Sequence, residues 1–297
     1  MYIRKARYSD MRQGTREALL TRQGIAEISA ASLASFGALS AAFQVALAIW
    51  PGLARHDISI LLLLAGGCLL VGAFHAWPKF EATHNYSHPN FAIQIKCGDI
   101  FDERDNVVVG FTDTFDTDMR HRDIISPSSV QGQFETKYYG EDITRLDSEI
   151  EDKLTNIPAL GRETGASKPR GKLIRYPIGT TIALNSGNIR AFAVAYGFMR
   201  NDLRVSCSVD ALWKSLTSTW DAVRIHGGLA PISIPVIGSE LARIGSLDRT
   251  SLIKMIALSF VASSREEIVS RQLTIVVHPK DRQSVNLMDV ERFLKSL

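Results

Sequence analysis

The sequence lacks the residues on which several classes of protein depend. Its three cysteines (Cys68, Cys97 and Cys207) are too few and too widely spaced for a disulfide framework or a zinc site, so we expect reduced thiols in an intracellular protein. With 45% hydrophobic residues, the 297-residue chain is too apolar to be intrinsically disordered. Residues 1–23 hold six basic and two acidic residues, a local net charge of +4 within a total of +3. The rest of the chain therefore has no basic excess, and we expect no nucleic-acid partner.

Two long segments, 28–54 and 58–78, contain no Asp, Glu, Lys or Arg. Each is long enough for a transmembrane helix, which needs about 20 mostly apolar residues. We therefore predict a transmembrane helical hairpin with spans near 28–50 and 58–78. The alternatives are a pair of buried helices in a soluble protein and a cleaved signal peptide, and the second apolar segment argues against the signal peptide.

Small residues recur along the first of these segments, where Ala30, Ala34, Ala38, Ala42 and Ala46 are four residues apart. Small residues on one helix face allow helices to pack closely in a membrane. The basic N-terminus predicts a cytoplasmic start, and two spans return the chain to the same side. We therefore expect a multi-pass protein of the cell inner membrane, in which the N-terminus and the larger domain are both cytoplasmic. A pore made from two helices per chain would require a homo-oligomer.

Residues 80–89 are polar and aromatic, which predicts a linker between a first domain at 1–88 and a second at 89–297. Short apolar segments then alternate with amphipathic ones, which is typical of a layered α/β domain with helices on both faces. The predicted strands are 91–97, 107–111, 173–184, 191–198, 231–237 and 273–277. The predicted helices are 128–139, 146–154, 210–224, 240–244, 249–264 and 287–295. The composition of residues 156–172 predicts a flexible surface loop.

Ligands of such a sheet bind beyond the carboxyl ends of the strands. Asp99 follows the first of these strands, where a buried carboxylate can accept from an exocyclic amine and the Ile100 amide can contact a ring nitrogen. An Asp in this place is otherwise an ordinary turn residue. Thr112, Asp113 and Asp116 form a polar turn after the next strand.

A serine-rich loop before a helix forms the second part of this candidate site. Ser128, Ser129, Gln131 and Gly132 provide hydroxyl and amide groups that suit a phosphate or a ribose. The alternative is simple capping of the helix by Ser126 or Ser128.

A third segment places a Gly-Ser turn between a strand and a short helix. Pro235, Gly238, Ser239, Glu240 and Leu241 have an arrangement that can hold a pyrophosphate with backbone donors alone. A carboxylate beside a pyrophosphate is unfavourable, so Glu240 either faces away or contacts a cationic group of the ligand.

In this order, the segments resemble a macro domain, the α/β module that binds ADP-ribose. Residues 98–100 are similar to the Gly-Asp-Ile motif of that family, in which the Asp holds the adenine amine. Residues 128–132 and 235–239 take the place of the two glycine-rich loops around the distal ribose and the phosphates. The resemblance implies a three-layer αβα fold with a mixed sheet over about residues 90–297.

A narrower resemblance lies in residues 111–116, 128–134, 175–180 and 234–239, behind two membrane helices. These are similar to the macro-type ThsA effectors of Thoeris antiphage defence. What this implies is an abortive-infection effector that binds an ADP-ribose-derived signal, thought to be a histidine conjugate, made from NAD by a partner TIR-domain enzyme. Binding would trigger oligomerisation and disruption of the lipid bilayer. The resemblance implies no cofactor and no metal.

The chain departs from the macro-domain pattern where the hydrolases of that family carry an Asn-rich turn and a run of glycines. Thr112, Asp113 and a Ser/Gln loop stand there instead, which favours binding without turnover. We hypothesise that Asp113, Asp116 or Glu240 pairs with an amino or imidazole group of the signal. The alternatives are a membrane-anchored ADP-ribosyl hydrolase, in which Asp113 or Asp116 acts as a base, and a scaffold that binds ADP-ribosylated partners.

Overall fold

The computed structural model describes residues 22–49, 65–68, 70–71, 81–103, 106–120, 124–140, 142–187, 189–239 and 247–297. The chain divides into two compact units. One comprises residues 1–80 with 286–289, and the other comprises residues 81–285 with 290–297. We describe each unit by itself.

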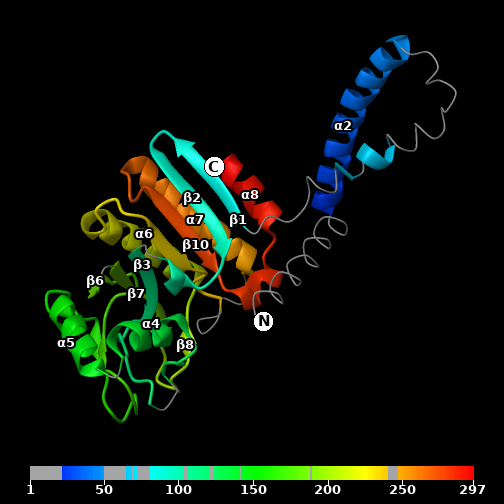
Figure 1. Ribbon diagram of the computed structural model, residues 1–297. Coiled ribbons are helices and arrows are strands. Elements are labelled where there is room, and N and C mark those ends of the chain that lie inside the picture. The colour runs from blue at the N-terminus through cyan, green and yellow to red at the C-terminus, as the bar shows by residue number, and fades with distance from the viewer. Residues whose placement is uncertain are drawn as a thin grey trace. The chain divides into compact units, whose positions relative to one another are not determined.

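Among the described residues of the first unit is one long helix, α2 (Arg22–Ile49), of 28 residues (Figure 1). Its alanine-rich sequence explains the helix, since alanine has the highest helix propensity. Leu33, Val45 and Ile49 on it are largely exposed. In the described part of the chain, no helix is both long and apolar enough to cross a membrane.

The predicted transmembrane hairpin is therefore not found among the residues that the structure describes. Helix α2 covers residues 28–49 of the first predicted span, 28–50. Most of the second predicted span, 58–78, lies outside the described residues, of which only 65–68 and 70–71 fall within it.

The second unit is built on a mixed eight-stranded sheet in the order β1-β2-β10-β9-β3-β7-β6, with β8 paired to β7. Its strands are β1 (Glu81–Ser87), β2 (Asn90–Cys97), β3 (Asn106–Thr112), β6 (Thr181–Ser186), β7 (Ile189–Met199), β8 (Val205–Ser206), β9 (Ile232–Pro235) and β10 (Gln272–Val277). The five strands from β2 to β7 in this order are parallel, whereas β1, β6 and β8 are antiparallel to their neighbours. The carboxyl ends of the parallel strands therefore lie at one edge of the sheet.

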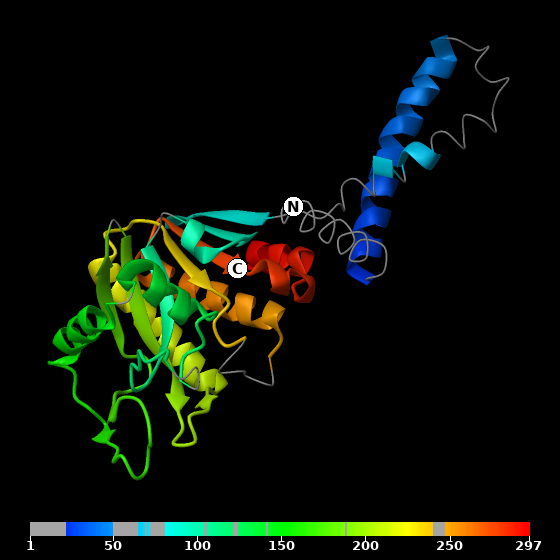
Figure 2. The ribbon, with the colours of Figure 1, turned by 60° about the horizontal axis from the view of Figure 1, so that its bottom comes forward.

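Helices cover both faces of this sheet. They are α4 (Val130–Tyr139), α5 (Ile143–Leu154), α6 (Val209–His226), α7 (Arg249–Glu266) and α8 (Leu287–Ser296), with short 3₁₀ helices η2 (Ile100–Asp102) and η3 (Pro279–Ser284). Figure 2 shows the orange α7 and the red α8 on the same side of the cyan strands β1 and β2.

Side chains along β7 point alternately into two cores, one on each face of the sheet. Ala191, Ala193 and Ala195 belong to the cluster that includes Phe134 of α4 and Ile150 of α5. Because side chains alternate along a strand, the neighbouring residues of β7 point to the opposite face, where α6 packs. On that face the rings of Trp220 and Phe260 meet edge to face with centroids 5.2 Å apart. Such a pair of large, fully buried aromatic side chains fixes the packing of α6 against α7.

Five of the six predicted strands and five of the six predicted helices are confirmed within a few residues, while 240–244 lies outside the described residues. The predicted strand 173–184 is instead two strands, β5 (Ile174–Arg175) and β6, which belong to different sheets. The linker predicted at 80–89 is wrong for residues 81–87, which form the edge strand β1. The surface loop predicted at 156–172 contains the short strand β4 (Gly161–Arg162), which pairs with β5 (Ile174–Arg175). It also buries Lys168 completely, so it is not a freely solvated loop.

Candidate functional site

A cavity of about 210 Å³ lies at the edge of the sheet where the parallel strands end. Its walls come from the ends of β3, β9 and β10 and from the start of α4. The lining residues are 110–112, 128–131, 133, 235–239, 276, 278 and 280–281, together with Ile124, Tyr196 and Val205. The cavity is therefore placed where open α/β sheets bind their ligands.

The structure brings together half of the residues predicted for this site. Those that line the cavity are Thr112, Ser128, Ser129, Gln131, Pro235, Gly238 and Ser239. Those described but outside its lining are Asp99, Ile100, Asp113, Asp116 and Gly132. Glu240 and Leu241 lie outside the described residues.

Asp99 caps the short helix η2, and its Oδ1 accepts a hydrogen bond of 2.9 Å from the backbone N–H of Phe101. Asp99 is exposed, contrary to the buried carboxylate that the sequence suggested, and its side chain has the capping role instead. The adjacent Ile100 is buried in the α4–α5 core.

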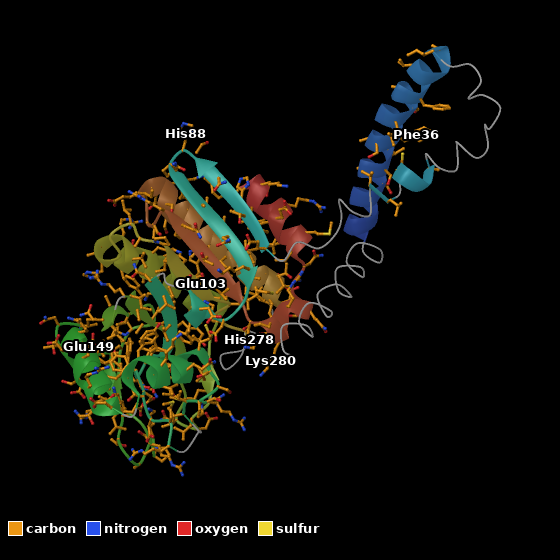
Figure 3. All side chains as sticks on the ribbon, viewed as in Figure 1. Phe36, His88, Glu103, Glu149, His278 and Lys280 are labelled. Carbon is orange, nitrogen blue, oxygen red and sulfur yellow. The ribbon has the colours of Figure 1, made fainter. Side chains whose placement is uncertain are left out.

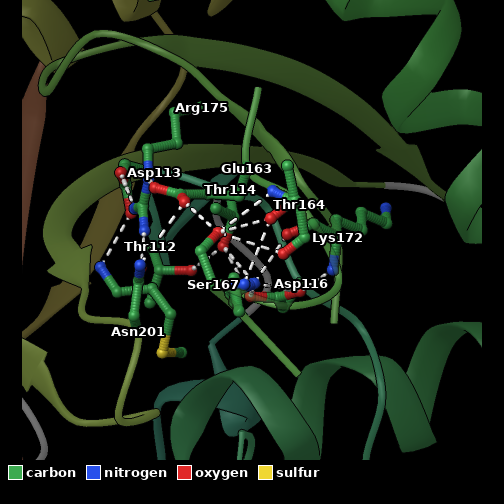
Figure 4. A network of polar contacts seen from close by, with 12 residues as sticks. Thr112, Asp113, Thr114, Asp116, Glu163, Thr164, Ser167, Lys172, Arg175 and Asn201 are labelled. Atoms are coloured by element: carbon green, nitrogen blue, oxygen red, sulfur yellow. Dashed lines mark hydrogen bonds and ion pairs between the residues drawn. The ribbon is translucent and has the colours of Figure 1, made fainter. Parts of the chain in front are cut away.

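Asp113 and Asp116 belong to a charged cluster beside the cavity, completed by Lys168 and Arg175 (Figure 4). Asp113 Oδ2 accepts from Arg175 Nη1 at 2.7 Å, and its Oδ1 accepts from the backbone N–H of Met199, also at 2.7 Å. Burial raises the pKa of Asp113, and the hydrogen bonds from Met199 and Arg175 oppose that rise. Its carboxylate is thus fully engaged within the protein.

Asp116 is held in the same way by residues from the segment after α5. Its Oδ2 lies 2.9 Å from Lys168 Nζ, and both side chains are buried. Thr114 donates to Oδ2 at 2.5 Å, and the Lys172 backbone N–H donates to Oδ1. We hypothesised that Asp113 or Asp116 pairs with a cationic group of the ligand. In this structure Asp113 is already paired with Arg175, and Asp116 is already paired with Lys168.

Helix α4 begins at the cavity. Ser129 is its N-cap and accepts from the Gly132 N–H at 3.1 Å, so neither Ser126 nor Ser128 has the capping role. A Cβ at Gly132 would overlap the Ser126 carbonyl, which explains a glycine in this tight turn. Ser128 is exposed and contributes to the cavity wall.

The opposite wall follows β9. The Ser239 hydroxyl donates to the Val236 carbonyl at 2.8 Å, which closes a turn. Gly238 within this turn has a φ of +88°, a conformation that side-chain-bearing residues rarely adopt. Because Gly238 has no side chain, its backbone lines the cavity directly.

The sequence analysis did not predict three residues of the cavity, which follow β10 in the chain. His278, Lys280 and Asp281 line the cavity, and Figure 3 shows His278 and Lys280 close together. His278 Nδ1 accepts from the Lys280 N–H at 3.2 Å, which leaves Nε2 as the ring N–H. Asp281 is paired with Arg249 at 2.8 Å. The rule that ligands bind beyond strand ends could have found them, because β10 itself was predicted.

The family of this chain follows from comparison with known proteins. A family model described as "Thoeris protein ThsA, Macro domain" matches residues 93–278. The chain belongs to this family. The match begins in β2 and ends at His278, so it spans every strand end that lines the cavity.

The fold of this ThsA macro domain is similar to that of a solved macrodomain. An Oceanobacillus iheyensis macrodomain solved with ADP is 13% identical, with a TM-score of 0.50 over 74% of this chain and 100% of that chain. A variant of that macrodomain solved with ADPR is 15% identical, with a TM-score of 0.46 over 72% of this chain and 97% of that chain. A search of curated proteins finds no match. The mixed-sheet α/β macro fold expected from the sequence is confirmed.

Proposed function

We propose that the ThsA macro domain of this chain binds ADP-ribose or a derivative of it in the cavity at the carboxyl ends of β3, β9 and β10. The observation that carries the proposal is the family match, which includes all of the strand ends around that cavity. The fold is shared with a macrodomain that was solved with ADP, a ligand that contains the same pyrophosphate.

The chemistry of the walls supports this ligand class. A pyrophosphate needs hydrogen-bond donors and positive charge. The backbone of the turn at Gly238 and the Nε2–H of His278 supply donors, and the side chain of Lys280 supplies the charge. The start of α4 adds the positive end of a helix dipole. The sequence indicated that backbone donors alone can hold a pyrophosphate, and Lys280 adds a side-chain charge to them.

The role that follows is binding without turnover. Asp113 and Asp116, the candidate bases, are held in the charged cluster, and Asp281 of the cavity wall is paired with Arg249. A general base must reach the proton that it removes, and none of these three carboxylates is free to do so. Turnover of an ADP-ribosylated substrate by the protein would contradict binding without turnover and would favour the alternative of a membrane-anchored ADP-ribosyl hydrolase.

We further propose that the chain is a Thoeris effector that responds to a signal made by a TIR-domain enzyme. The signal would be histidine-conjugated ADP-ribose, and its binding would drive self-association and disruption of the cell inner membrane. The two uncharged sequence segments, 28–54 and 58–78, support membrane attachment through residues 1–80, with the macro domain in the cytoplasm. A ligand shifts such an assembly only if the bound form favours the oligomer.

Isothermal titration of the full-length protein with ADP-ribose, its histidine conjugate and NAD tests the binding proposal. We expect binding of ADP-ribose and tighter binding of the conjugate. Absence of binding to both ADP-ribose and the conjugate would overturn the binding proposal.

Leakage of dye from vesicles carrying the full-length protein tests the effector role, because the conjugate should trigger leakage. Leakage that is independent of ligand would contradict it.

A further inference from the structure

Gln131 holds its side-chain amide in one orientation. Its Nε2 donates to the backbone carbonyl of Asp116 at 2.7 Å and to Glu135 Oε1 at 2.9 Å. A backbone carbonyl can only accept, so the nitrogen of the amide must lie on this side. The amide oxygen, Oε1, then points away from both partners. Gln131 lines the cavity, and its Oε1 has no hydrogen-bond partner among the described residues.

Glu135 lies one turn further along α4 and holds this orientation by accepting the hydrogen bond from Gln131 Nε2. It is fully buried, and its Oε2 lacks a hydrogen-bond partner in the described part of the chain. A buried carboxyl in this position is far more stable as the neutral acid. Burial accordingly raises the pKa of Glu135 to about 8; the hydrogen bond from Gln131 and the charge of Lys172 oppose the rise, and the charge of Asp147 adds to it. The neutral acid keeps its carbonyl oxygen as an acceptor for Gln131.

The two sides of the cavity therefore favour different chemical groups of a ligand. The Gln131 side presents a fixed acceptor, whereas His278 and Lys280 on the other side present donors and positive charge. A phosphate or carboxylate oxygen placed against Gln131 Oε1 would meet another acceptor and lose its own hydrogen bonds with water. A hydroxyl or N–H group placed there would be satisfied.

We propose that Glu135 is a positioning residue, and that the Gln131 carbonyl it fixes selects ligands whose non-adenine end carries a hydrogen-bond donor. The inference rests on the proposed binding of ADP-ribose. The ligand then lies with its pyrophosphate toward His278 and Lys280 and with its donor end against Gln131. ADP-ribose meets this requirement through its terminal hydroxyl groups, whereas ADP ends in an anionic phosphate.

Titration of the full-length protein with ADP-ribose and with ADP tests the proposal. Gln131→Met keeps the size of the side chain and removes the acceptor. We expect its affinity for ADP-ribose to fall about three- to tenfold, the effect of one hydrogen bond, with no loss for ADP. Gln283→Met, an exposed change on η3, is the matched control and should alter neither affinity.

Variants of Glu135 test the positioning role. Glu135→Gln keeps an acceptor for Gln131 and should retain the preference for ADP-ribose, whereas Glu135→Met should reduce it. Circular dichroism establishes that each variant is folded, and Gln131→Met decides the outcome if Glu135→Met is not. An equal loss of both affinities in Gln131→Met, or no loss of either, overturns this inference alone. A wild-type protein that binds neither ligand overturns the proposed function as well.

Discussion

Two groups of polar residues meet at the end of β3, and the protein uses them in opposite ways. In the charged cluster, Asp116 and Asp113 are paired with Lys168 and Arg175 and are shielded from solvent. In the cavity wall, Gln131 is also held by the protein through its Nε2, but its Oε1 has no partner among the described residues and the side chain lines the cavity. The comparison teaches that residue type alone does not separate a structural group from a ligand-binding one. The partners of each atom do.

The largest effect should come from breaking the charged cluster. Lys168→Met leaves Asp116 buried without its partner, and we expect the free energy of unfolding to fall by about 3–5 kcal/mol. Urea denaturation measures this loss. Lys153→Met, which removes an exposed ion pair with Asp152, is the control and should change stability by less than about 0.5 kcal/mol. Adding Asp116→Asn to Lys168→Met should restore part of the loss, and no restoration would contradict the pairing.

Glu135 gives a pH-dependent effect. Its pKa rises from 4.5 to about 8 on folding, so the folded protein holds a proton that the unfolded chain releases. This contribution to stability is present below pH 4.5 and is lost as the pH rises through about 8. Glu135→Gln has no such proton, so its stability relative to wild type should increase by up to about 1.4 kcal/mol per pH unit in that range.

Thermal unfolding of both proteins between pH 5 and pH 8 checks this prediction. The charged groups that act on Glu135 are Asp147 and Asp118, which raise its pKa, and Lys172, which lowers it. Glu151→Gln, an exposed change on α5, should show no such trend. A stability difference that does not vary with pH would mean that Glu135 is ionised in the folded protein.

The two adjacent serines at the start of α4 sharpen the comparison within one loop. Ser129→Ala removes the N-cap and should lower stability by about 1 kcal/mol. Ser128→Ala, in the exposed cavity wall, should leave stability unchanged within about 0.5 kcal/mol. Denaturant unfolding of the two variants side by side measures the difference. Equal losses would show that Ser128 has a structural role as well.

The smallest expected effect concerns the cationic side of the cavity. Lys280→Ala should weaken binding of ADP-ribose only about two- to fivefold, because the side chain is exposed and its charge is screened. Titration at low and high salt checks this, since the difference between variant and wild type should shrink as salt is added. Lys295→Ala, on α8, which does not line the cavity, serves as the control.

The strands and most helices were predictable because their apolar periodicity is local. The edge strand β1 was not, since only Ala82 in it is buried and its polar sequence resembles a linker. An edge strand forms because a neighbour supplies hydrogen bonds, here β2, and not because its own residues are apolar. The segment 156–172 was mistaken for a flexible loop for a related reason. Its Lys168 is buried by pairing with Asp116, 52 residues earlier in the chain.

The amino-acid sequence by itself determined where most strands lie along the chain, the family resemblance and the edge of the sheet where polar turns gather. These depend on residues near one another in the chain. Only the tertiary structure decided which polar residues line the cavity, because that depends on partners distant in sequence. Asp116 is turned from the cavity by Lys168, while its backbone carbonyl holds Gln131 toward it. His278 and Lys280 join the site because β10 lies between β2 and β9 in the sheet.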